Sequence, residues 1–371
     1  MTSEMVIVVE PNHTGHRMQY ARWLYDWCLA EGKRFALATA SKALVSDEFQ
    51  ARFADVPHPA VVDLGVRQHV GTLRYQLWVL QCLRQVLKEH PEARVLLPEG
   101  DKTLALLWTL GRASRRVGVL VMRVPGPGGG LGSRLKRTVV SLSSQGGRVR
   151  VLAPSRPPAD NYVWRGFQAA PDPVELTHRA DSGTPGFLEP VVGSSDGRVW
   201  IGLLGALNAR KNVTRVLDAA AAIEDPQRIG VLLAGRVAPA YSAELAVSLD
   251  AARARGVTVH LEDRFLTDAE LDFAIAAVDV AVTAYSHDAP SGIFGKAASV
   301  GTYVVAAGNQ SLREAIAPLG YRAIYSELSL TGLRAALTEA VTSSQEHPRE
   351  PIELAGPAEF AASLAATVCS N

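Results

Sequence analysis

Short apolar segments alternate with amphipathic helical patterns along almost the whole chain of 371 residues. This alternation is typical of parallel β-sheets covered by helices, so it predicts an α/β fold. The pattern stops in a segment rich in proline, serine and glycine, Arg156–Asp196, and then starts again. A chain of this length accommodates two domains. We therefore expect two Rossmann-like, doubly wound domains that face a central cleft, with ligands at the carboxyl ends of the strands.

The strands that we expect are short runs of valine, leucine, isoleucine and alanine. Those of the first half are Met5–Glu10, Arg34–Thr39, Ala60–Leu64, Arg94–Leu97, Val117–Val124 and Arg148–Ala153. Those of the second half are Arg198–Leu204, Ile229–Ala234, Val257–Leu261, Val278–Thr283, Tyr303–Ala307 and Arg322–Tyr325. These ranges place an N-terminal domain at residues 1–175, a linker at 176–196 and a C-terminal domain at 197–354.

Charge and cysteine content exclude several classes of protein. Lys and Arg number 38 against 37 Asp and Glu, which argues against a dedicated nucleic-acid binder. Three scattered cysteines do not make a disulfide framework and fit a reducing compartment. The N-terminus lacks the features of a signal peptide, and no apolar run reaches the roughly 18 residues of a membrane span. We expect a soluble, cytoplasmic protein.

Common nucleotide and hydrolase motifs fail on this sequence. The glycine cluster Gly126–Gly132 does not fit G-x-G-x-x-G, and Pro290 and Ala297 occupy the Gly and Ser/Thr positions of a P-loop. The chain has no H-E-x-x-H or D-x-D pattern, and its G-x-S-x-G match, Gly193–Gly197, lies at the end of the predicted linker and not between a strand and a helix. We therefore expect neither a metal nor a cofactor, and we disfavour dehydrogenase, kinase, serine hydrolase and metal-dependent transferase activities.

A basic turn follows the first strand of the second half. Gly205 opens this turn, and Arg210 and Lys211 come just before the next helix. Cations at the N-terminus of a helix are unfavourable unless an anion binds there, and Arg and Lys both bind phosphate. The turn therefore predicts a donor-diphosphate site. The alternative is a solvated basic pair at a helix start.

A second loop follows the strand that ends near Thr283. Ser291 is the predicted N-cap of the next helix, and the amides of Gly292 and Ile293 are open to a ligand. We expect this loop to face Arg210 and Lys211 across the same sheet edge and to complete the diphosphate site. The alternative is an ordinary strand–loop–helix turn with a serine cap.

These stretches resemble the GT-B glycosyltransferases, specifically the retaining family 4. The turn G-x-L-x-x-R-K-N, the segment Leu232–Arg236 and the run S-G-I-F-G-K-A-A-S-V-G-T-Y-V-V carry the resemblance, which covers roughly Trp200–Ala307. It implies a nucleotide-sugar donor on the C-terminal domain, an acceptor on the N-terminal domain, retention of configuration and no metal. It also implies that a helix at about 355–371 returns to the first domain, and that Arg236 lies near the donor.

Two glutamates of that family are replaced here. They align with Asp288 and Lys296. Asp288 keeps a carboxylate for the sugar hydroxyls, whereas Lys296 cannot accept hydrogen bonds from a ribose. Either the site is rearranged, with the Lys296 ammonium at the cleft mouth contacting the donor or acceptor, or the site has decayed and Lys296 points to solvent.

Two loops of the first half are candidates for acceptor binding and catalysis. His13, Gly15 and His16 follow the first strand, where this fold class places a loop against donor phosphate and acceptor. Glu99 and Asp101 follow another strand and can orient an acceptor hydroxyl. We predict Asp101, His16 and Asp288 as catalytic. The alternatives are capping or structural histidines, and a helix-capping Asp101 beside a surface Glu99.

The glycine-rich stretch Pro125–Ser133 is followed by Arg134, Lys136 and Arg137. It is either an acceptor element that binds an anionic acceptor or a lipid headgroup, or a solvated basic helix face. The sequence as a whole predicts a glycosyltransferase whose acceptor is a small molecule, a glycan or a lipid-linked molecule, with room for peripheral membrane contact. The alternative is a non-catalytic GT-B binding or partner subunit with a decayed nucleotide site.

Overall fold

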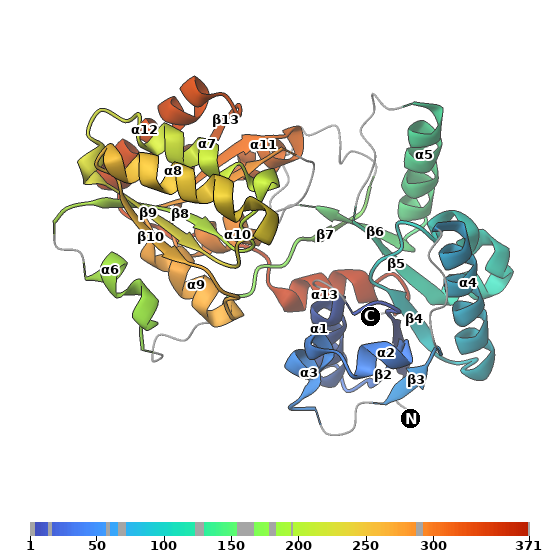
Figure 1. The fold of residues 1–371 in the computed structure, drawn as a ribbon. Coiled ribbons are helices and arrows are strands. Elements are labelled where there is room, and N and C mark those ends of the chain that lie inside the picture. The colour runs from blue at the N-terminus through green and yellow to red at the C-terminus, as the bar shows by residue number, and fades with distance from the viewer. Residues whose placement is uncertain are drawn as a thin grey trace. The chain divides into compact units, whose positions relative to one another are not determined.

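Two parallel β-sheets organise the chain in the computed structural model (Figure 1). The structure describes residues 4–13, 17–56, 60–65, 72–122, 130–153, 167–177, 183–193, 196–286 and 292–369. Unit 1 consists of Met1–Pro173 and Ala355–Asn371, and unit 2 of Val174–Leu354. None of the helices in these ranges is long and apolar enough to cross a membrane.

Unit 1 contains a seven-stranded sheet in its described residues. The strands are β1 (Met5–Val9), β2 (Arg34–Thr39), β3 (Val61–Asp63), β4 (Arg94–Leu97), β5 (Val117–Val121), β6 (Val149–Ala153) and β7 (Ala169–Pro171), in the order β3-β2-β1-β4-β5-β6-β7. The helices are α1 (Arg17–Ala30), α2 (Ser41–Leu44), α3 (Asp47–Phe53), α4 (Thr72–Glu89), η1 (Leu104–Arg116), α5 (Leu131–Gln145) and α13 (Pro357–Ala365).

Alternate residues of the central strand of unit 1 are buried on opposite faces of the sheet. Val6 and Val8 of β1 lie in one core with residues of α1, α3 and α13, whereas Ile7 and Val9 lie in another with residues of α4, η1 and α5. This is the alternation expected of a strand with helices on both faces.

Unit 2 contains a six-stranded sheet in its described residues. The strands are β8 (Val199–Leu204), β9 (Ile229–Ala234), β10 (Thr258–Glu262), β11 (Val280–Tyr285), β12 (Tyr303–Gly308) and β13 (Ala323–Ser326), in the order β10-β9-β8-β11-β12-β13. The helices are η2 (Gly186–Leu188), α6 (Glu189–Val192), η3 (Ala209–Lys211), α7 (Val213–Ala220), η4 (Pro226–Arg228), η5 (Pro239–Tyr241), α8 (Ser242–Ala254), α9 (Asp268–Ala277), α10 (Gly292–Ser299), α11 (Gln310–Ile316), η6 (Ala317–Arg322) and α12 (Leu330–Glu346).

Each sheet has a point where the order of its strands reverses. In unit 1 this point lies between β1 and β4, and in unit 2 it lies between β8 and β11. Open α/β sheets bind ligands outside the carboxyl ends of the strands at such switch points. The fold therefore directs attention to the residues that follow β1 and β4 in unit 1, and β8 and β11 in unit 2.

The structure differs from the sequence-based expectation in several places. Part of the predicted linker forms η2 and α6, whose Leu188 and Val191 are buried in a core of unit 2. The strand β7 and the helix η1 were not predicted. The end of the glycine-rich stretch is helical, because α5 begins at Leu131, and residues 123–129 lie outside the described ranges.

Candidate functional site

The turn after β8 has a defined geometry. Gly205 takes φ +81°, and the Asn208 side chain accepts a hydrogen bond from the Arg210 amide at 3.1 Å. Asn212 lies in the left-handed region, and its Nδ2 donates to the carbonyls of Ala284 at 3.0 Å and Arg210 at 3.3 Å. Because Asn tolerates this conformation better than most residues, Asn212 both ends η3 and ties the turn to β11.

The end of β11 is bound to the same turn. The Ser286 amide donates to the Arg210 carbonyl at 3.1 Å, directly after Tyr285 at the end of the strand. The structure thus brings the basic turn next to the start of the second predicted loop. Gly292 and Ile293 form the first turn of α10, whereas the predicted residues Asp288 and Ser291 lie outside the described residues.

Lys211 is a partly buried cation at the carboxyl end of β8. Its Nζ donates to the Leu204 carbonyl at 2.8 Å and lies 5.8 Å from the centroid of the Tyr285 ring. Burial and, less strongly, the charge of neighbouring Arg210 together lower the pKa of Lys211 to about 8. A bound anion would relieve both effects, so the site is electrostatically prepared for a phosphate.

At the carboxyl ends of the unit 2 strands, two glycines bring the backbone of one segment into direct contact with that of the next. Gly235, at φ +142°, lies so close to Gly205 that an added Cβ would be 2.2 Å from the Gly205 oxygen. Gly308, at φ +112°, approaches the Tyr285 oxygen in the same way. No side chain larger than hydrogen fits at these two positions, which keeps the strand ends close together beside Lys211.

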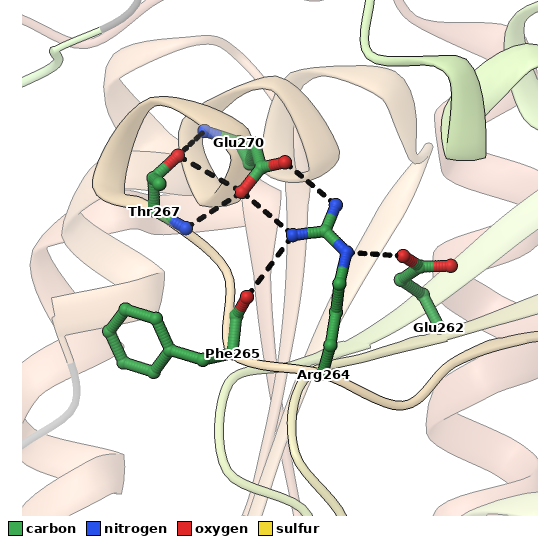
Figure 2. A network of polar contacts seen from close by, with 5 residues as sticks. All are labelled: Glu262, Arg264, Phe265, Thr267 and Glu270. Carbon is green, nitrogen blue, oxygen red and sulfur yellow. Dashed lines mark hydrogen bonds and ion pairs between the residues drawn. The ribbon is translucent and has the colours of Figure 1, made fainter.

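Cations at this edge differ in whether they already have acidic partners. Arg264, beyond the end of β10, donates to Glu262 and to both carboxylate oxygens of Glu270, as Figure 2 shows. Within the described ranges, in contrast, no carboxylate forms an ion pair with Arg210, Lys211 or Arg236. Arg210 and Arg236 are exposed, so these two residues and Lys211 are the ones available to a ligand anion.

Lys296 does not simply point to solvent, as we expected of a decayed site, and its contact with donor or acceptor stays a prediction. Its ammonium forms an ion pair with Asp272 of α9, whose side chain has no exposure to solvent. The second oxygen of Asp272 accepts from the Thr177 amide at 2.6 Å and from its hydroxyl at 3.0 Å. Lys296 thus neutralises a buried carboxylate and connects α10 to α9.

At the switch point of unit 1, the end of β1 holds a buried acid that the sequence reasoning missed. Glu10 directly follows β1, is 1% exposed, and accepts from the Asn12 amide at 3.0 Å. Burial and, less strongly, the charge of Glu99 raise the pKa of Glu10 to about 8, against the opposing effects of the Asn12 amide and of Arg17. Its Oε2 is buried without a hydrogen-bond partner in the described structure. The feature of the sequence that could have revealed Glu10 is a charged residue directly after an apolar strand.

The residues of unit 1 that we predict for the site follow β1 and β4 in the described structure. Glu99 follows β4 and accepts from the Arg17 side chain, whose Nε lies 4.0 Å from Glu10. Asn12 donates to the Tyr75 hydroxyl at 2.8 Å. His13 is half-buried. The predicted Gly15 and His16 lie outside the described residues.

Asp101 connects β4 to the segments that follow it. It accepts from the Met122 amide at 2.8 Å and lies 3.6 Å from the Lys136 ammonium. Arg137 lies over the Phe167 ring, 5.0 Å from its centroid. Of the three basic residues that we assigned to an acceptor element, Arg134 is exposed, whereas Lys136 and Arg137 make contacts within unit 1.

Solved structures share this architecture over nearly the whole chain. HepE from Anabaena in complex with UDP has a TM-score of 0.62 at 13% identity, covering 98% of this chain and 93% of that one. A putative UDP-N-acetylglucosamine 2-epimerase from Listeria monocytogenes has a TM-score of 0.65 at 12% identity, covering 97% and 94%. Sucrose-phosphate synthase from Thermosynechococcus elongatus has a TM-score of 0.62 at 12% identity, covering 98% and 94%. No protein-family model and no curated protein matches the chain.

The two parallel-sheet units and these similarities establish the GT-B fold for this chain. Identities of this size establish the fold alone. Proteins of this architecture include transferases and an epimerase, so the reaction must be argued from the residues of the site.

Proposed function

We propose that the chain is a glycosyltransferase that moves a sugar from a nucleoside-diphosphate sugar to an acceptor, without a metal and with retention of configuration, as in family 4. The observation that carries the proposal is Lys211, a partly buried cation without a carboxylate partner in the described structure, at the switch point of unit 2. Burial disfavours the charged form of this group and no carboxylate in the described structure compensates it, which favours a role with an anionic ligand.

The described residues of unit 2 supply what departure of a diphosphate requires. Negative charge develops on the leaving phosphate oxygens, and preorganised cations and amides stabilise it most effectively. Lys211 provides a point charge and Arg210 a planar donor that can grip two oxygens. The amides of Gly292 and Ile293 at the start of α10 add donors, because the first amides of a helix have no partner within the helix.

Unit 1 supplies groups suited to an acceptor hydroxyl. Glu99 and Asp101 follow β4 as carboxylates, and His13 follows β1. In the proposed reaction one of these groups orients the attacking hydroxyl. His16, Asp288, Ser291 and Gly15 stay predictions from the sequence, and the same holds for a cytoplasmic location.

A ligand panel followed by a transfer assay tests this function. The rise in melting temperature is measured with UDP, GDP and ADP, each at millimolar concentration. One of the three should raise the melting temperature clearly more than the other two. The Lys211→Met variant should lose that rise, whereas the Lys88→Met variant, at an exposed lysine of unit 1, should keep it.

The results separate the competing functions. Release of the nucleoside diphosphate that depends on an added acceptor, in the presence of EDTA, supports the proposed transferase. Epimerisation of the donor sugar without an acceptor would show that the protein is an epimerase and not a transferase. The absence of any nucleotide-dependent stabilisation would favour the non-catalytic subunit.

A further inference from the structure

Three consecutive helices of unit 1 carry a strongly one-sided charge. Within α4, η1 and α5 the basic residues are Arg74, Arg84, Lys88, Arg112, Arg115, Arg116, Arg134, Lys136 and Arg137, and the acidic residue is Glu89. The whole chain, in contrast, has 38 basic and 37 acidic residues. The excess of positive charge is therefore local to this group of helices.

The same helices expose large apolar side chains. Leu73 and Leu77 of α4 are 65% and 45% exposed, and Trp108 of η1 is 76% exposed. On α5, the exposed fractions are 86% for Leu131, 67% for Leu135 and 65% for Leu142. Several large apolar residues exposed on neighbouring helices mark an interaction surface more often than single exposed residues do.

These side chains share one outer surface, which we call the α4–η1–α5 surface. The three helices cover the same face of the unit 1 sheet, because residues from all of them lie in the core that contains Ile7 and Val9. The helix η1 contacts both α4 and α5. The exposed basic residues of this surface are Arg74, Arg84, Lys88, Arg112, Arg115 and Arg134.

Periodicity places the apolar residues of two helices on their outward sides. On α5, Leu131, Leu135 and Leu142 fall within one narrow stripe at 100° per residue, on the side opposite buried Val140. On α4, Leu73 and Leu77 share a stripe with Arg84 and Lys88. On α5 the leucine stripe thus lies opposite the buried side, whereas on α4 the stripe of leucines and cations borders the buried side, on which Leu80 is 3% exposed.

We infer that the α4–η1–α5 surface binds the anionic surface of a lipid bilayer. Lysine and arginine are attracted to anionic headgroups, and leucine and tryptophan side chains insert at the boundary between headgroups and acyl chains. A surface that binds nucleic acid would need the cations but gains little from exposed leucines. The inference does not rest on the proposed transferase activity, and its test needs no donor or acceptor.

Sedimentation with vesicles tests the inference on the full chain. The protein should pellet with vesicles of phosphatidylglycerol and phosphatidylcholine, and much less with vesicles of phosphatidylcholine alone. Raising the salt to about 0.5 M should weaken binding, because surface charges are then screened over a few ångströms. Equal binding to both kinds of vesicle, or none to the anionic ones, overturns the inference.

Two double variants and one control variant locate the contact. Leu131→Gln with Leu135→Gln, and Arg112→Glu with Arg115→Glu, should each lower the partition coefficient about tenfold or more. The control, Leu330→Gln with Arg334→Glu, changes an exposed leucine and an exposed arginine on α12 of unit 2 and should leave binding unchanged. Equal losses in the control and the α5 variant overturn the assignment.

Tryptophan fluorescence and a soluble polyanion complete the test. Anionic vesicles should shift the emission of the wild type to the blue, and the Trp108→Phe variant should lose most of that shift. Heparin should compete only weakly at the same salt concentration. If heparin binds tightly to the α4–η1–α5 surface while vesicles do not, the surface recognises a soluble polyanion and the lipid assignment is wrong.

Discussion

The ammonium of Lys296 is paired with the carboxylate of Asp272, which no solvent reaches. The two residues are 24 positions apart, on α10 and α9. The same carboxylate accepts two hydrogen bonds from Thr177, so its charge is compensated from two directions. Lysine at position 296 therefore has a structural role, whatever the site binds, because it keeps Asp272 from being a buried charge without a counterion.

The first prediction concerns the substitution Lys296→Glu. This change places a second carboxylate against buried Asp272 and removes its counterion, so we expect a loss of about 3–5 kcal/mol in the free energy of unfolding. Chemical denaturation monitored by circular dichroism measures this loss. Lys296→Arg keeps the charge and should cost much less. A Lys296→Glu protein as stable as the wild type would show that the ion pair does not form.

The second prediction concerns the protonation of Lys211. The pKa of Lys211 is about 8 without a ligand, and a bound phosphate favours the charged form. Affinity for the nucleoside diphosphate should therefore fall as the pH rises above 8, with proton uptake on binding. Calorimetry in two buffers of different ionisation enthalpy detects this proton. The binding enthalpies at pH 8 in the two buffers are first corrected for titration of the phosphate itself. If they are then equal, Lys211 takes up no proton on binding, which contradicts the prediction.

The variant Lys211→Met separates binding from stability. It should weaken nucleoside-diphosphate binding by about 1.5–3 kcal/mol, the range for hydrogen bonds to charged groups. Because folding lowers the pKa from 10.5, the charge costs stability below pH 8, and this cost disappears as the pH rises to 10.5. At pH 7 the variant should accordingly be more stable, by about 1–2 kcal/mol after allowance for partial exposure. A less stable variant would indicate that Lys211 serves the fold instead.

The third prediction concerns Glu10, whose pKa is raised from 4.5 to about 8 in the folded protein. The protonated form is stable in its buried site, so this contribution to stability is complete below pH 4.5 and is lost as the pH rises through 8. Arg17 and Glu99 are the charged groups that act on Glu10. Glu10→Gln should remove this pH dependence and stabilise the protein above pH 8 by roughly 2–4 kcal/mol.

Denaturation of the wild type and of Glu10→Gln at pH 5 and pH 8.5 measures this effect. The two proteins should differ little at pH 5 and clearly at pH 8.5. Glu31→Gln, at an exposed glutamate of the same unit, serves as the control and should show no such difference. A constant difference between the wild type and Glu10→Gln at both values would mean that Glu10 does not titrate between them.

The fourth prediction uses two glycines with positive φ. At Gly235 an added Cβ would be 2.2 Å from a backbone oxygen, whereas at Gly320 it would meet nothing within 4 Å. Gly320→Ala therefore reports the cost of the conformation alone, about 1 kcal/mol. Gly235→Ala adds a clash with backbone and should cost about 2–4 kcal/mol, with loss of nucleotide stabilisation. Similar melting temperatures for the two variants would contradict the close contact of Gly235 with Gly205.

The strands could be predicted because each is a buried apolar run between polar turns. Ile229–Ala234 is an example: every residue of β9 is buried, and the observed bounds agree with the expected ones. The three residues Ala169–Pro171 are too few and too ordinary to stand out, and their pairing with β6 depends on contacts that no local pattern encodes. Strand order and the two switch points likewise come from long-range pairing.

The site could be predicted only where its chemistry is local. Arg210 and Lys211 are neighbours in the sequence, so the basic turn could be recognised from them alone, and its binding of phosphate stays a proposal. The partner of Lys296 could not, because Asp272 lies on another helix and its burial depends on how α9 packs. In the sequence Glu10 is only the end of the predicted strand Met5–Glu10. That its carboxyl is buried depends on the surrounding fold, which no local pattern reveals.

The helix α13 gives the chain an unusual order of completion. Phe360 of this helix is fully buried and packs against Tyr20 and Trp23, with ring centroids 4.9 Å and 5.8 Å apart. Unit 1 thus needs residues that the ribosome adds after all of unit 2, whereas the residues of unit 2 are continuous in the sequence. We expect unit 2 to acquire its core during synthesis and unit 1 to wait. The part of the protein that is made first is then the part that is finished last.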